Sequence, residues 1–344
     1  MTRRGVVVTV GLLGAAAVGI LSAQSPSSAP DWAYGYMVPV APTTQVAPPC
    51  PPTKKAFECA YPAPPLVEDG VKNTLPDTPI SLTRYETYWD YGPGDWYPGD
   101  HPTMPPIVAK GKQDQQVRAC ALCHYPNGQG KMENGGVAGL PAGYILQQLE
   151  AFKNGDRRSS DPRKANANEM IRIASSLTPE EAKAAADYFS SMPWRPWTRV
   201  VESETAPTVR ATINGLLLPV AGQPTQPLGN RIIETPENPE STDVTRNPRS
   251  GFVAYAPMGS IAKGKEIAAT GGGKTLQCSI CHGPELKGVG NVPGIAGRTT
   301  SYTMRQLWDI KQGTRKSQMM TPVVANLTMD DMLSLTAYVS SLKP

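Results

Sequence analysis

Two short stretches decide the fold: CALCH at residues 120–124 and CSICH at residues 278–282. Each has two cysteines three positions apart and a histidine directly after the second. They begin two copies of one repeat, because adding 158 to each number from 120 to 157 gives residues 278 to 315 without a gap. The matched pairs include Pro126 with Pro284, Gly139 with Gly297, Tyr144 with Tyr302, Gln148 with Gln306 and Arg157 with Arg315. The chain therefore contains the same small unit twice.

Helix start and stop signals recur in both copies. The segments at residues 144–155 and 302–313 are typical of short helices ended by glycine. A final helix is predicted after Thr178, where Thr-Pro-Glu-Glu forms a capping box with proline at the first helical position, and after Thr328, where the acidic version is weaker. Strand patterns are scarce outside residues 193–257. The expected fold class is mainly α, with two small, loop-rich helical domains in tandem.

The C-x-x-C-H spacing is that of covalent haem attachment. Two thiols three positions apart can bond to the two vinyl groups of one haem edge, and the next histidine is then placed beneath the iron. A redox dithiol or half of a zinc site are the alternatives, but the matched repeats and an export signal favour haem. The predicted attachment residues of two haem c groups are Cys120, Cys123, Cys278 and Cys281, and the proximal iron ligands are His124 and His282.

The sixth ligand of each iron must come from elsewhere. The chain has only three histidines, so at most one haem could be ligated by two of them. After eight extra residues in the first copy, an offset of 150 matches Met170 to Met320, each seven residues before the Leu-Thr that opens the final helix. This matched position nominates both methionines as axial ligands. The rivals are Met319 for the second haem, and Met132, Met192, Met104 and His101 for the first.

At residues 104 to 192 and 258 to 342 the sequence closely resembles the two-haem periplasmic cytochromes c with tandem class I domains. The resemblance implies that the motif histidine and the later methionine ligate iron in each domain. A family proline that orients the proximal histidine is similar to Pro293, eleven residues after His282. The first copy has Gly135 at that place, so this part of the resemblance does not extend to the support of His124.

The remaining segments predict export and a long connection. Arg3 and Arg4 precede an apolar run that ends in small residues, which indicates a secretory signal or, alternatively, an uncleaved membrane anchor. Cys50 and Cys59 predict a short disulfide, with an axial thiolate as the alternative. The expected organisation is a signal at 1–23, a proline- and aromatic-rich extension packed on a domain at 24–103, domains at 104–192 and 258–344, and a partly extended linker at 193–257.

Composition and ligation together predict the function. The formal net charge of +4 in 344 residues is far from that of a nucleic-acid binder. If histidine and methionine hold both irons, no coordination position is open to a substrate. We therefore expect a periplasmic electron carrier, or a cytochrome subunit of a respiratory or dehydrogenase complex, that meets redox partner proteins. The alternative is a two-haem peroxidase or thiosulfate dehydrogenase with one open or His/Cys-ligated iron.

Overall fold

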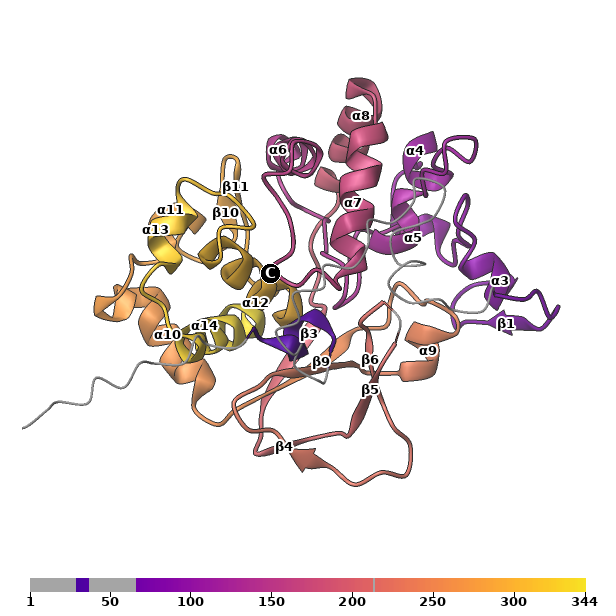
Figure 1. Ribbon diagram of the computed structural model, residues 1–344. Helices are drawn as coiled ribbons and strands as arrows, with labels where there is room; N and C mark the ends of the chain where they lie inside the picture. The colour runs from indigo at the N-terminus through magenta and orange to yellow at the C-terminus, as the bar shows by residue number, and fades with distance from the viewer. Residues whose placement is uncertain (1–28, 37–65, 213) are drawn as a thin grey trace, which may run out of the picture.

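A computed structural model describes residues 29–36, 66–212 and 214–344 (Figure 1). The first repeat contributes α4 (Pro106–Ala109), α5 (Cys120–His124), α6 (Ala142–Lys153), α7 (Ala165–Ser176) and α8 (Pro179–Ser190). The second contributes α10 (Ser260–Thr270), α11 (Ser279–His282), α12 (Thr300–Lys311), α13 (Met320–Val324) and α14 (Met329–Ser341). The mainly helical prediction is confirmed, and each repeat has its own group of helices.

The helix signals act as predicted. Thr178 Oγ1 accepts a hydrogen bond from the Glu181 N–H (3.2 Å), and the Glu181 carboxylate accepts one from the Thr178 N–H (2.8 Å). Thr328 and Asp331 form the same box at the start of α14. Gly155, shortly after α6, has a φ of +82°, in the left-handed region that glycine adopts at low cost. Both copies therefore share one local design.

The linker is more ordered than its composition suggests. Strands β3 (Thr198–Glu202) and β8 (Ile233–Pro236) lie on either side of β9 (Phe252–Ala256), parallel and antiparallel to it respectively. A hairpin of β5 (Val209–Ala211) and β6 (Leu217–Pro219) carries the buried residues 216–218. The hairpin thus buries an apolar run, and the linker shares one hydrophobic core with the second repeat.

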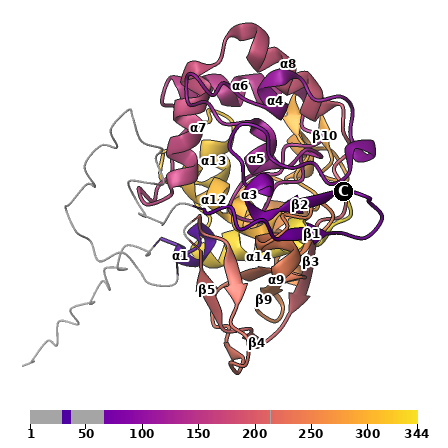
Figure 2. The ribbon, with the colours of Figure 1, turned by 90° about the vertical axis from the view of Figure 1, so that its right-hand side faces the viewer.

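The aromatic extension packs mainly on the linker. It forms β1 (Lys72–Thr74), β2 (Ser81–Thr83) and α3 (Arg84–Thr87), which Figure 2 shows in front of the linker strands. The Trp96 ring is 1% exposed, and its Nε1–H donates to the Thr245 carbonyl over 2.6 Å. The Tyr88 hydroxyl donates to the Asp243 carbonyl at the end of α9 (Pro239–Asp243). Aromatic side chains therefore anchor the extension, as predicted, but on the linker.

A second piece of the extension reaches the other repeat. Helix α1 (Asp31–Tyr34) lies beside α12 in both ribbon views. Its Trp32 and Tyr34 side chains are buried in the core of the second repeat. Within the described ranges no helix is both long and apolar enough to cross a membrane. The predicted signal or anchor at residues 1–23, and Cys50 and Cys59, lie outside those ranges.

Equivalent residues of the two repeats exchange equivalent hydrogen bonds across their interface. The Arg157 guanidinium donates to the Tyr302 hydroxyl over 2.9 Å, and Arg315 donates to the Tyr144 hydroxyl over 2.7 Å. The backbones of the two arginines pair as an antiparallel bridge. This reciprocity is that of an isologous two-fold contact, here made within one chain. The repeats are therefore docked in one fixed orientation by residues that the repeat itself duplicates.

Candidate functional site

The first C-x-x-C-H motif faces a large cavity. Its residues form α5, and Cys120, Cys123 and His124 line a cavity of about 960 Å³. Met170, from α7, lines the same cavity. The structure thus brings together the four residues that the sequence nominated for the first haem.

The cavity is suited to a flat apolar macrocycle. Its apolar lining includes Leu122, Val137, Leu140, Ile145, Leu149, Phe152, Ile173 and Phe189. Burial raises the pKa of Cys120 to about 12, and burial also raises the pKa of Cys123. Among the described residues, no three His, Cys, Asp or Glu side chains are grouped to hold a bare metal ion.

Each motif histidine is oriented by a backbone carbonyl. His124 Nδ1 lies 2.7 Å from the Gly135 oxygen, and His282 Nδ1 lies 2.8 Å from the Pro293 oxygen. Because a carbonyl only accepts, each Nδ1 must carry the proton, which leaves Nε2 as the ligating atom. Burial lowers the pKa of both imidazoles, which favours the neutral form. His124 is therefore supported in the same way as His282, although the proline is missing.

The close packing between the repeats explains why residue 135 is glycine. A β-carbon built on Gly135 would lie 2.8 Å from the Tyr302 ring, closer than real β-carbons approach carbon atoms. Proline or alanine at this position would therefore collide with the second repeat. Gly135 still supplies the backbone carbonyl that orients His124, because every residue type has one. The sequence did not reveal the contact between Gly135 and Tyr302, because these residues are far apart in the chain.

The rivals to Met170 lie elsewhere. Met132 is fully buried in the core of the second repeat and linker, while Met192 and Met104 belong to the core of the first repeat. The His101 imidazole lies 3.1 Å from an Asp95 carboxylate oxygen and 2.9 Å from the Pro102 carbonyl. None of these four residues lines the cavity that holds the first motif. This placement favours Met170.

The second motif is more exposed. His282 is buried at the end of α11, whereas Cys278 and Cys281 are partly exposed. Met320 begins α13 and packs, like Cys278, at the border of the main core. Met319 is 67% exposed. The structure thus favours Met320 over Met319, and its assignment as an iron ligand stays a prediction.

The comparisons with known proteins match this arrangement. The sequence profile of the family Cytochrome c matches residues 108–193 and again 261–343. The chain is also 36% identical over 85 residues to cytochrome c-554(547) of Halothiobacillus neapolitanus, covering 93% of that protein and 21% of this chain. The chain belongs to the cytochrome c family. Each matched segment contains one C-x-x-C-H motif, so the chain carries two haem c groups.

Two longer relatives show how far the likeness extends. The chain is 26% identical over 242 residues to a thiosulfate dehydrogenase electron acceptor of Stutzerimonas stutzeri, covering 69% of this cytochrome and 84% of that protein. It is 38% identical over 87 residues to cytochrome c4 of Azotobacter vinelandii, covering 22% of this cytochrome and 41% of the relative. The likeness to cytochrome c4 therefore spans less than half of that relative's length.

Proposed function

We propose that this cytochrome is a periplasmic electron carrier, or a cytochrome subunit, in which histidine and methionine hold each iron. The observation that carries the proposal is the shared cavity of Cys120, Cys123, His124 and Met170. When bound, the haem iron supplies one-electron redox chemistry. An iron with both axial positions filled by protein side chains has no free position for a substrate, so the chain transfers electrons and does not catalyse a reaction.

In this proposal the residues of the chain have separate roles. The four motif cysteines bond the haem edges covalently, and His124 and His282 bind iron through Nε2. Met170 and Met320 supply the opposite ligands, and methionine ligation raises a haem potential. The apolar lining of the first cavity excludes water, which further favours the reduced iron. The proposal includes two cytochrome domains at residues 104–192 and 258–344, and residues 1–23 as a cleaved signal or an uncleaved anchor.

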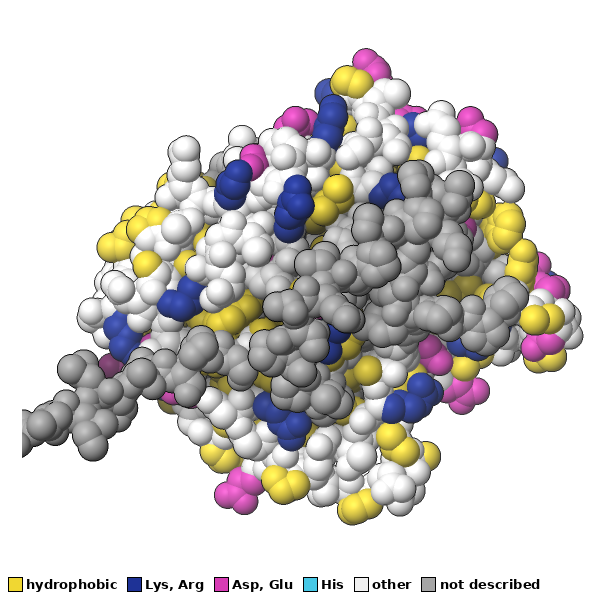
Figure 3. Space-filling view, in the orientation of Figure 1, with side chains coloured by type: hydrophobic (Ala, Val, Ile, Leu, Met, Phe, Trp, Pro, Cys, Tyr) yellow, Lys and Arg dark blue, Asp and Glu magenta, His cyan; other side chains and the backbone are white. Residues whose placement is uncertain are grey.

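The proposed partner is a periplasmic dehydrogenase that delivers electrons to this cytochrome. The relative from Stutzerimonas stutzeri is named as the electron acceptor of such an enzyme. The second motif also offers a contact surface: Ile280, within it, is 66% exposed, and Met319 is 67% exposed. Figure 3 shows yellow apolar side chains at the left edge, where Figure 1 places α11 and α13, among interspersed charges. A small apolar surface beside a haem suits a brief encounter.

Carbon monoxide binding to the reduced holoprotein tests the ligation. The wild type should show two low-spin haems and no carbon monoxide complex. Met170→Ala should open the first iron and Met320→Ala the second, so each variant should bind one equivalent. Met192→Ala and Met319→Ala are the matched controls, because Met192 belongs to the core of the first repeat and Met319 is 67% exposed. Carbon monoxide binding by the wild type would overturn the carrier proposal and favour an enzyme with an open iron.

A further inference from the structure

The cavity of the first haem has an excess of positive charge. Eight basic and five acidic side chains line it. The basic ones are Arg84, Arg118, Lys131, Arg157, Arg158, Lys164, Arg246 and Arg305, and the acidic ones are Asp69, Asp90, Glu133, Glu169 and Asp309. Some of these charges pair directly, as Lys131 does with Glu133 at 2.6 Å. The buried cations among them need an explanation, because buried charge is costly without a counter-charge.

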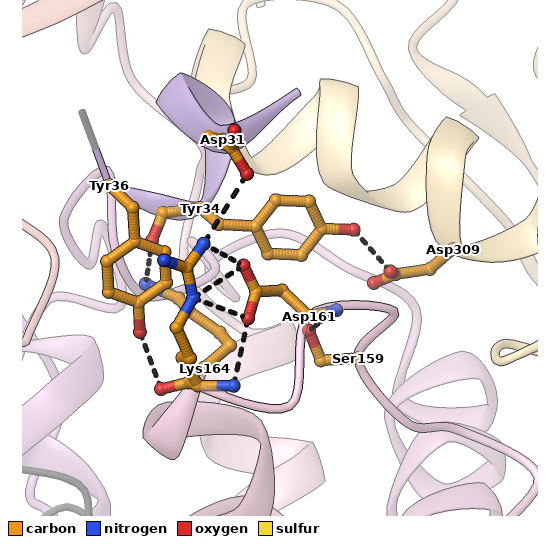
Figure 4. Close-up of polar contacts among 8 residues, drawn as sticks. Asp31, Tyr34, Tyr36, Ser159, Asp161, Lys164 and Asp309 are labelled. Atoms are coloured by element: carbon orange, nitrogen blue, oxygen red, sulfur yellow. Dashed lines mark hydrogen bonds and ion pairs between the residues drawn. The ribbon is translucent and has the colours of Figure 1, made fainter. Parts of the chain in front are cut away.

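Lys164 is a buried cation whose hydrogen-bond partners carry no negative charge. It is 3% exposed, and its Nζ lies 3.3 Å from the backbone carbonyls of Tyr34 and Asn214. Figure 4 shows the contact with the Tyr34 backbone. Within the described part of the chain, no carboxylate lies within ion-pair distance of this ammonium group. Burial lowers the pKa of Lys164 well below its ordinary value, as expected for an ammonium group that lacks a counter-ion.

Arg305 is also a buried cation that donates hydrogen bonds to backbone carbonyls. Its guanidinium, 4% exposed, donates to the carbonyls of Ala33 (2.5 Å) and Met132 (3.0 Å). The nearby Asp309 carboxylate instead accepts a hydrogen bond from the Tyr34 hydroxyl, as Figure 4 shows. Lys164 and Arg305 thus present two cations, held mainly by neutral carbonyls, to the same cavity. A haem has two carboxylates, its propionates, which are the anions that such a pair would bind.

Lys164 and its carbonyl partners come from segments that have no full counterpart in the second repeat. Lys164 lies in the segment 158–169, which is eight residues longer than its counterpart 316–319 in the second repeat. Its carbonyl partners belong to the extension (Tyr34) and to the linker (Asn214), outside both matched domains. At the position equivalent to Lys131 the second repeat has Val289, which is 60% exposed. Lys164 and the carbonyls that hold it therefore have no counterpart in the second repeat.

We propose that Lys164, together with Arg305, binds a propionate of the first haem and makes that haem the higher-potential one of the two. A cation held in a buried, weakly polar site stabilises the reduced iron, which has one positive charge fewer. The inference rests on the proposed attachment of a haem at Cys120 and Cys123. It gives the carrier a direction, because electrons that enter at the exposed second haem move to the buried first one.

A redox titration of the holoprotein variant Lys164→Met tests this inference. Methionine keeps the length of the side chain and removes the charge. The wave of the first haem should move to lower potential by about 59 mV, a tenfold change in the reduction equilibrium for one electron. Met170→His identifies this wave, because replacing the thioether with an imidazole lowers the potential of the iron that it ligates.

Two further variants separate the inference from general effects. Lys183→Met removes a lysine charge from the same repeat, but that side chain is 69% exposed, so neither wave should move. Lys164→Arg keeps the charge and should leave the potential close to that of the wild type. The inference is overturned if Lys164→Met moves neither wave, or moves only the wave that Met170→His leaves in place. If Met170→His moves neither wave, the ligand assignment fails instead.

Discussion

Replacing Gly135 with alanine tests the close packing between the two repeats. The added β-carbon would meet three atoms of the Tyr302 ring at 2.8, 3.2 and 3.3 Å, so the ring must move. It cannot move freely, because the Tyr302 hydroxyl accepts the hydrogen bond of Arg157. Overpacking of this kind costs about 1–3 kcal/mol of unfolding free energy. A shift of residue 135 would also weaken the hydrogen bond that its carbonyl accepts from His124.

Denaturant unfolding of the holoprotein measures the cost, and the haem absorption of the first site reports on His124. Gly99→Ala is the matched control, because a β-carbon there meets no atom within 4 Å and should leave the stability nearly unchanged. In the double variant with Tyr302→Ala the collision is gone, so Gly135→Ala should then cost much less than it does alone. Equal stability of the Gly135→Ala and Gly99→Ala proteins would refute the reasoning.

Three further predictions concern local interactions. Thr178→Ala should lower the free energy of unfolding by about 1 kcal/mol through loss of the α8 cap, while serine at this position should retain it. Trp96→Phe should cost about 1 kcal/mol, because the Thr245 carbonyl loses its buried donor; a wild-type denaturation midpoint would contradict this. Burial raises the pKa of Asp331, but the hydrogen bonds from Lys274 and Thr328 outweigh it and hold that pKa well below 3.8. The ionised Asp331 carboxylate therefore stabilises the fold fully at neutral pH, and this stabilisation is lost as the pH falls from 3.8 through the lowered pKa. Asp331→Asn should be less stable than the wild type at pH 7, and its stability should depend less on pH in acid.

The local features of the fold follow from the sequence because they depend on neighbouring residues. A capping box needs a side chain and the backbone three residues later, and a helix-ending glycine needs only its own φ angle, so both could be recognised in each copy. The ends of α6, α8, α12 and α14 follow these signals. The linker sheet could not be recognised in this way, because β3 and β8 both pair with β9, and β3 and β9 are about fifty residues apart in the chain.

Some residues of the candidate site could also be predicted from the sequence, and others could not. The attachment cysteines and His124 are recognisable because the haem imposes one spacing on adjacent residues. Met170 could be nominated only because the chain repeats itself, and its place in the cavity with His124 comes from the packing of α7. No sequence pattern predicted the role of Lys164, because its burial depends on carbonyls from residues 34 and 214, which are distant in the chain.

The sequence alone determined that the chain has two c-type haem motifs in two helical repeats, because covalent attachment and helix capping are short-range chemistry. Only the tertiary structure decided how the repeats differ. Gly135 lies where a proline would collide with Tyr302, and Lys164 and Arg305 line one cavity because the second repeat packs against the first. Such differences depend on which distant segments come into contact, and packing determines that.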